Sequence, residues 1–140
     1  MVLYTPAILA LSVELAGFPL NESFQCLGMA RSRLCGSTIE FGCNSDSNGR
    51  IKSVGAKVSA CAIGQASAAL FLRSAAGRDL MAIEIAKEDL AAWLTDNGPR
   101  PDWPDIGELD AARAYPARHP VILLPWMAAV DALSLDVRAG

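Results

Sequence analysis

Two cysteines, Cys35 and Cys61, have the surroundings in this 140-residue chain that best suit chemistry. Cys61 stands where a β-prone run meets a helical pattern of small residues that begins at Ala62. The unpaired N–H groups and the dipole at a helix N-terminus stabilise a thiolate, the form that binds metals or attacks sulfur. Cys35 lies upstream, before Gly36 and Ser37, across a short predicted strand. The spacing raises the question of whether the two thiols meet at one site.

Cys26 and Cys43 are weaker candidates for that site. Cys43 lies eight residues beyond Cys35, which is roughly 26 Å along an extended strand and too far to share one metal ion. We expect it to pack in or beside the sheet, whereas Cys26 reaches the site only if its strand lies next to it. The alternative for Cys61 itself is a buried, inert thiol that packs as a small hydrophobic residue.

The composition narrows the class of protein. The chain is 52% hydrophobic and 19% charged, and its 12 basic and 15 acidic residues give a net charge of −3. No cluster of Lys and Arg provides the positive surface that nucleic-acid binding needs, so DNA and RNA are excluded as partners. The low charged fraction leaves room for a protein partner or for homo-oligomers.

Targeting and membrane signals are missing from the sequence. The apolar N-terminus has no basic residue before Arg31, so it does not look like a signal peptide. No stretch approaches the roughly 18 apolar residues of a membrane span. Four cysteines are too few for a disulfide-stapled secreted domain. We therefore expect one domain over residues 1–140, in the cytoplasm and without a membrane partner.

The order of predicted elements indicates an α+β fold. Strands come first and helices follow, which favours a small three-stranded antiparallel sheet covered by helices. Asn48-Gly49 predicts a hairpin turn, and Gly55 predicts a β-bulge in the following strand. The predicted strands span 24–30, 37–43 and 51–58, and the predicted helices start at Thr5-Pro6 and span 62–76, 80–95, 106–114 and about 125–135.

Several motifs in this order resemble one family. They are Cys35-Gly36-Ser37 with the hairpin behind it, the block 61–70, the helix 86–94 and the segment from Arg118 to Leu133. Together they resemble the U-type iron–sulfur cluster assembly scaffolds, which include IscU, SufU and the N-terminal part of NifU, with spacing most like the SufU branch. The resemblance implies an IscU/SufU-like fold and an exposed site for a nascent iron–sulfur cluster or, in some members, zinc.

The resemblance also implies residue roles. Cys35 takes the place of the first cysteine ligand and Cys61 that of the second, and thiolates are the preferred ligands of iron–sulfur clusters and zinc. Where the family has an aspartate after Cys-Gly, this chain has Ser37. Aligning the closing motif places Pro125 where a third cysteine belongs, with Leu124 and Trp126 on either side, so we expect these three to form an apolar partner surface.

Two substitute ligands and two functions follow. Ser37 and His119, the single histidine, could complete a weak metal site. The first function is a scaffold that binds iron or a cluster, or accepts sulfur from a cysteine desulfurase, through Cys35 and Cys61. The alternative is a degenerate relative without a metal site that acts as a protein-interaction module. No catalytic constellation is present, and a lone cysteine nucleophile lacks an orienting base, so an enzyme is not expected.

Overall fold

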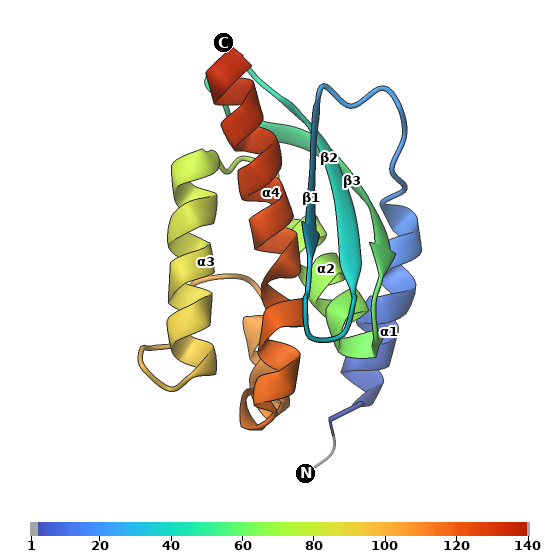
Figure 1. Cartoon of the computed structure of the whole chain (residues 1–140), viewed down its shortest axis with the longest axis vertical. Coiled ribbons are helices and arrows are strands. Elements are labelled where there is room, and N and C mark those ends of the chain that lie inside the picture. Colours follow the sequence, from blue (N-terminus) through green and yellow to red (C-terminus); the bar gives the residue numbers. More distant parts are fainter. Residues whose placement is uncertain (1–2, 140) are drawn as a thin grey trace.

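The protein is a three-stranded antiparallel sheet with helices packed mainly on one of its faces, as the computed structural model of residues 3–139 shows (Figure 1). The strands β1 (Cys26–Arg31), β2 (Thr38–Ser45) and β3 (Ile51–Ser59) lie in the order β1-β2-β3. This confirms the predicted α+β class and the three-stranded antiparallel sheet. The helices are α1 (Pro6–Glu14), α2 (Ala62–Ser74), α3 (Leu80–Leu94) and α4 (His119–Ala139), with 3₁₀ segments η1 (Leu15–Gly17), η2 (Ile106–Ala114) and η3 (Pro116–Arg118).

The layers follow from the alternation of side chains along the strands. Buried residues of β1 and β2 face α4, and β3 lies against α2. Outside this layer α1 packs on α2 and α3 packs on α4 (Figure 1). The centre is aromatic: Phe71 stacks on Trp103 at 5.3 Å between ring centroids, and Trp126 meets both rings edge-on. These contacts fix α2 and α4 against each other and against the sheet.

Local sequence explains where α1 and α3 start. Thr5 accepts a hydrogen bond from the N–H of Ile8 at 3.1 Å and Pro6 opens α1, as predicted. Asp79 caps α3 by accepting from the N–H of Ala82 at 2.9 Å.

No helix within residues 3–139 is long and apolar enough to cross a membrane.

The expectation of a bulge at Gly55 is wrong. Gly55 pairs in regular register with Gly42, and the irregularity of this ladder lies between Asn44 and Ser45. Gly55 is required instead because the chain at Pro19 crosses directly over it, and a Cβ there would clash with the Pro19 carbonyl.

The predicted start of the last helix is also wrong. α4 begins at His119, six residues before Pro125, which lies inside the helix. Pro120 occupies the first turn, where a missing N–H costs nothing, and the helix tolerates the second proline in its interior. Pro125 and the residues after it therefore sit one to two turns deeper in the helix than expected.

Candidate functional site

The tight turn between β1 and β2 presents Cys35 to solvent. The N–H of Ser32 donates to the carbonyl of Ser37 at 2.8 Å, and the N–H of Gly36 donates to the carbonyl of Ser32 at 2.9 Å. Gly36 has φ of +70°, a left-handed conformation in which a side chain would be strained. The two serines are buried at 3% and 7% exposure while Cys35 between them is exposed. The turn thus holds an accessible sulfur above two inward-pointing hydroxyls.

The polar surroundings of Cys35 favour its thiolate. Its Sγ lies 3.5 Å from the Ser32 Oγ and 2.9 Å from the Ser37 Oγ. Once the thiol loses its proton, hydroxyl donation from Ser32, then from Ser37 and its backbone N–H, stabilises the anion, and the charge of Arg118 adds to the effect. These interactions lower the pKa of Cys35 from its ordinary value to about 7. The thiolate of Cys35 therefore forms at a lower pH than that of an ordinary cysteine.

Cys61 reaches the same region from the other end of β3. It is the N-cap of α2, with extended backbone angles, and its thiol makes no capping hydrogen bond. Because Thr38, at the start of β2, pairs with Ser59, at the end of β3, the turn before β2 and the chain after β3 lie at the same end of the sheet. Cys61 is half-buried there, at the helix start that the sequence predicts.

The two thiols share one shallow hollow of about 310 Å³. Its other walls are Gly36, Ser37, Ser59, Ala60 and Arg118, and no Asp or Glu is among them. Arg118, just before α4, supplies the positive charge. An open depression with two thiols, hydroxyl donors and a guanidinium suits an anionic sulfur species.

Of the two predicted substitute ligands, Ser37 lies at this hollow and His119 does not. Ser37 lines it, but its hydroxyl is engaged with Cys35. His119 lies in a neighbouring groove, where its Nε2 is 3.0 Å from the carbonyl oxygen of Arg113. Among the described residues, no group of three or more His, Cys, Asp or Glu is placed to hold a metal ion.

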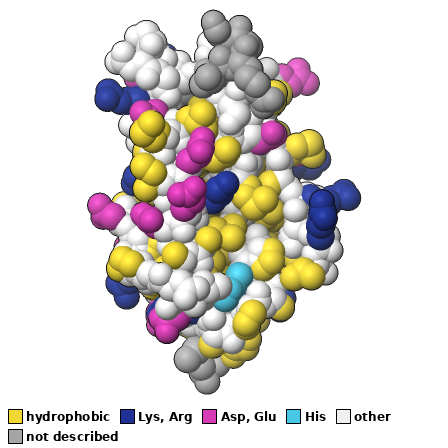
Figure 2. Space-filling model, turned by 60° about the vertical axis from the view of Figure 1, so that its left-hand side comes forward, with side chains coloured by type: hydrophobic (Ala, Val, Ile, Leu, Met, Phe, Trp, Pro, Cys, Tyr) yellow, Lys and Arg dark blue, Asp and Glu magenta, His cyan; other side chains and the backbone are white. Residues whose placement is uncertain are grey.

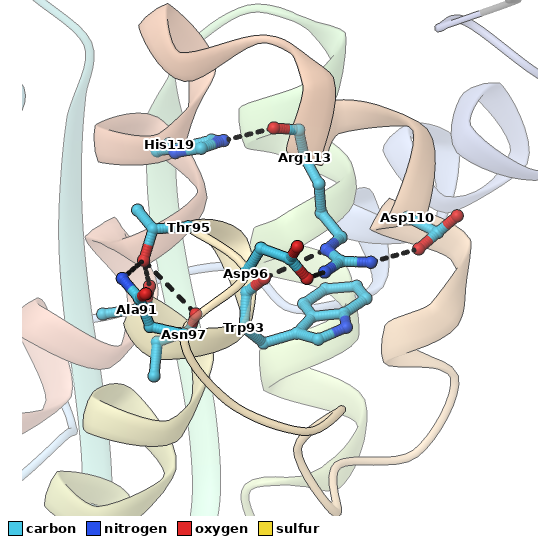
Figure 3. A network of polar contacts seen from close by, with 9 residues as sticks. Ala91, Trp93, Thr95, Asp96, Asn97, Asp110, Arg113 and His119 are labelled. Carbon is cyan, nitrogen blue, oxygen red and sulfur yellow. Dashed lines mark hydrogen bonds and ion pairs between the residues drawn. The ribbon is translucent and has the colours of Figure 1, made fainter.

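His119 belongs to a polar network that fastens α3 to the start of α4 (Figure 3). Arg113 lies over the Trp93 ring at 4.8 Å, donates from Nε to the Trp93 carbonyl at 3.0 Å, and pairs with Asp96 at 2.9 Å and Asp110 at 3.1 Å. The His119 contact joins this guanidinium residue to α4. A structural role in positioning α4 accounts for the histidine.

The expectation that Leu124, Pro125 and Trp126 form an apolar surface is wrong, because all three are buried. Pro125 and Trp126 are buried, the latter at 1% exposure, because the longer α4 turns them into the core. Leu124, at 3% exposure, contributes only a wall to the groove that His119 also lines.

Cys26 and Cys43 lie outside the site, as expected. They are directly opposite each other in the ladder between β1 and β2, and are 4% and 0% exposed. The Arg31–Thr38 pair next to the turn lies five residues further along the ladder, which is roughly 17 Å of strand.

Two residues of the site were not singled out from the sequence. Ser32 stands three residues before Cys35, and its role depends on the turn closing back on itself. Arg118 is part of the closing motif, but only the early start of α4 brings it to the hollow.

Comparisons with known proteins agree with this fold. The sequence matches no protein-family model and no curated protein. Among solved structures, the N-terminal part of a nitrogen-fixing NifU-like protein from Brucella abortus superposes with a TM-score of 0.89 at 26% identity, over 99% of this chain and 96% of that one. A proposed iron–sulfur cluster assembly scaffold of the SUF system from the thermophile Fervidobacterium islandicum AW-1 gives 0.81 at 22% identity, over 94% and 96%. The chain thus has the fold of the U-type iron–sulfur cluster assembly scaffolds and a NifU-like and SufU-like relationship to them.

Proposed function

We propose that this chain serves in iron–sulfur cluster assembly as a scaffold-type sulfur carrier, with Cys35 as the accepting thiol and Cys61 as the second thiol. The observation that carries the proposal is the hollow that both cysteines line, with Arg118 beside a Cys35 whose pKa is about 7. The similarity to scaffold structures supports the assembly context.

The chemistry is transfer of one sulfur atom. The Cys35 thiolate attacks the outer sulfur of a persulfide on a donor cysteine, such as that of a cysteine desulfurase. A new S–S bond forms on Cys35, the donor's S–S bond breaks, and the donor cysteine leaves as a thiolate. No external oxidant or reductant is needed. Arg118 and the hydroxyls of Ser32 and Ser37 stabilise the negative charge of the attacking sulfur.

Iron, zinc or a cluster would be held by an incomplete ligand set. Iron–sulfur clusters and structural zinc sites use four donors, and this hollow offers two thiols. Cys35 and Cys61 would therefore bind such cargo together with ligands from a second protein or from solvent. No resident cofactor is required for the sulfur-transfer step.

A second candidate function, a protein-interaction module without a metal site, is supported by the small number of possible metal ligands at the hollow. The hollow has two thiols, and no group of three or more His, Cys, Asp or Glu among the described residues could hold a metal ion, which also fits a partner-binding relative that has given up the metal site. Anaerobic purification followed by metal analysis separates the two. Iron or zinc that is present in stoichiometric amounts and lost in both Cys35→Ala and Cys61→Ala contradicts a metal-free module.

The sulfur-carrier proposal is tested with glutathione persulfide and intact-protein mass spectrometry. We expect the wild-type protein to gain one sulfur atom, Cys35→Ser to gain none, and Cys26→Ser, the control, to behave as wild type. Transfer that is equally fast in Cys35→Ser and wild type would contradict the proposal.

A further inference from the structure

A groove adjoins the thiol hollow on the other side of the β1–β2 turn. It has a volume of about 470 Å³ and lies between the turn and the first turns of α4. We call it the α4 groove, and it is lined by Arg31, Ser32, Arg33, Leu34, Pro116, His119, Pro120, Leu123, Leu124 and Met127.

The lining of the α4 groove is apolar with a positive rim. Six of its ten residues are Leu, Pro or Met, two are arginines, and none is acidic, although the whole chain has a net charge of −3. Two other hollows of the surface contain both signs: one combines Arg100 with Asp105 and Glu108, and the other Arg78 with Asp89 and Asp102. The α4 groove therefore differs in charge from these two hollows and resembles the adjoining thiol hollow, which also has an arginine and no acidic residue.

Several side chains of the α4 groove are exposed to solvent. Leu34 is 73% exposed and Met127 41%, and neither Arg31 nor Arg33 forms an ion pair with any side chain that the structure describes. Figure 2 shows the cyan histidine among yellow hydrophobic side chains, with dark-blue cations at the right of the same face. Apolar side chains that gather beside unpaired cations are typical of a recognition surface.

The position of the groove ties it to Cys35. Ser32 and Leu34 line the groove, while Cys35, Gly36 and Ser37 line the hollow, so one short turn forms the wall between them. Arg118 lines the hollow and His119 the groove, which places a second shared wall at the start of α4. A ligand in the groove would thus contact the same turn that carries the accepting sulfur of Cys35.

We propose that the α4 groove docks a short segment of the sulfur-donor protein that carries Asp or Glu beside Leu, Phe or Met. The apolar side chains pack on Leu34, Leu123 and Met127, and the acidic ones pair with Arg31 and Arg33. This identity of the occupant rests on the proposed sulfur-carrier function. Charge complementarity selects an acidic segment over a basic one, and the adjacency to Cys35 selects a donor of sulfur over an unrelated partner.

The first test measures binding of defined peptides by fluorescence anisotropy. The probes are four labelled peptides of about ten residues that combine acidic or basic with apolar or polar side chains. We expect saturable binding of the acidic apolar peptide alone, weakened by salt because the ion pairs are at the surface. Met127→Glu should weaken it about tenfold or more, whereas Met81→Glu, the matched exposed methionine on α3, should not.

A charge variant has its own control. Arg33→Gln should weaken binding of the acidic peptide and flatten its salt dependence, and Arg100→Gln should leave both unchanged. Binding of all four peptides alike, or equal binding to Met127→Glu and wild type, would overturn the proposal. So would a concentration-dependent dimer that Met127→Glu abolishes, because the occupant would then be a second copy of the chain.

The second test separates docking from sulfur chemistry. The acidic apolar peptide is given a C-terminal cysteine persulfide, and its sulfur transfer to Cys35 is compared with transfer from glutathione persulfide. We expect the peptide to react about tenfold faster in wild type and no faster in Met127→Glu, while glutathione persulfide reacts equally with both. No advantage of the peptide overturns the docking proposal alone, whereas no transfer from either donor overturns the sulfur-carrier function.

Discussion

The four cysteines form two pairs in contrasting environments, one pair at the end of the sheet and the other within it. Cys35 and Cys61 lie at the edge where the turn before β2 meets the start of α2, in an open hollow with polar donors. Cys26 and Cys43 face each other across β1 and β2 and are almost fully buried. The difference shows that a cysteine at a chain reversal of this fold meets solvent and polar groups, whereas a cysteine within a strand is packed in the core.

The physical origin of the difference is the backbone. A strand residue pointing inward meets helices, so Cys43 packs as a small apolar side chain and is 0% exposed. In the turn, by contrast, the side-chain hydroxyls of neighbouring residues are free to bond locally. The hydroxyls of Ser32 and Ser37 therefore contact the Cys35 sulfur. Burial raises the pKa of a thiol and such donors lower it. The two pairs should therefore differ most in reactivity.

The largest expected difference is in alkylation of the folded protein. Iodoacetamide at pH 7 should label Cys35 first and the half-buried Cys61 next, because the Cys35 thiolate is exposed and stabilised. Cys26 and Cys43 should react about a thousandfold more slowly or less, since their labelling requires opening of the sheet. Peptide mass spectrometry over a time course measures all four rates.

Labelling in denaturant provides the control for this comparison. With the sheet unfolded, the four rates should converge, because no side chain remains shielded. Labelling of Cys43 at the rate of Cys35 in native buffer would break the distinction between the two pairs.

A smaller effect is expected on stability. Cys43→Ser places a hydroxyl in the core of the sheet and should lower the free energy of unfolding by roughly 1–3 kcal/mol. Cys35→Ser, the same substitution in the exposed turn, should stay within about 0.5 kcal/mol. Urea unfolding followed by circular dichroism compares the two. Equal losses would mean that the turn supports the fold as much as the buried pair does.

Much of this fold could be predicted because its signals are local. The N-cap Thr5 and the first-turn Pro6 start α1, and a change from strand to helical periodicity at Cys61 marks the start of α2. The sequence predicts the start of α4 at Pro125 because proline is typical of a first helical turn, whereas Pro120 opens the helix and tertiary packing carries it through the second proline. The sequence does not distinguish the two roles of a strand glycine, because a glycine required by a crossing chain, as Gly55 is, looks the same as one required by a bulge.

The site was predictable only in part. Cys35 and Cys61 stand out by type and position, and both line the hollow. Ser32 and Arg118 act through a turn closure and a helix start that no local pattern specifies. The predicted partner surface is wrong for the same reason. The sequence predicts that α4 starts at Pro125, with Trp126 at the rim of the site, but α4 starts six residues earlier and Trp126 lies in the core.

The smallest expected effect is a change in the pH profile of Cys35. Ser37→Ala and Ser32→Ala each remove a hydroxyl that stabilises the thiolate, so the pKa of Cys35 should rise from about 7 toward its ordinary value. The alkylation rate, which follows the thiolate fraction, then reaches its midpoint at higher pH. A rise of one unit makes labelling at pH 7 roughly fivefold slower. Ser59→Ala, at the hollow but not bonded to Cys35, should keep the wild-type profile. Unchanged midpoints in both serine variants would show that the turn exposes Cys35 without activating it, and the contrast with the buried pair would then be one of access alone.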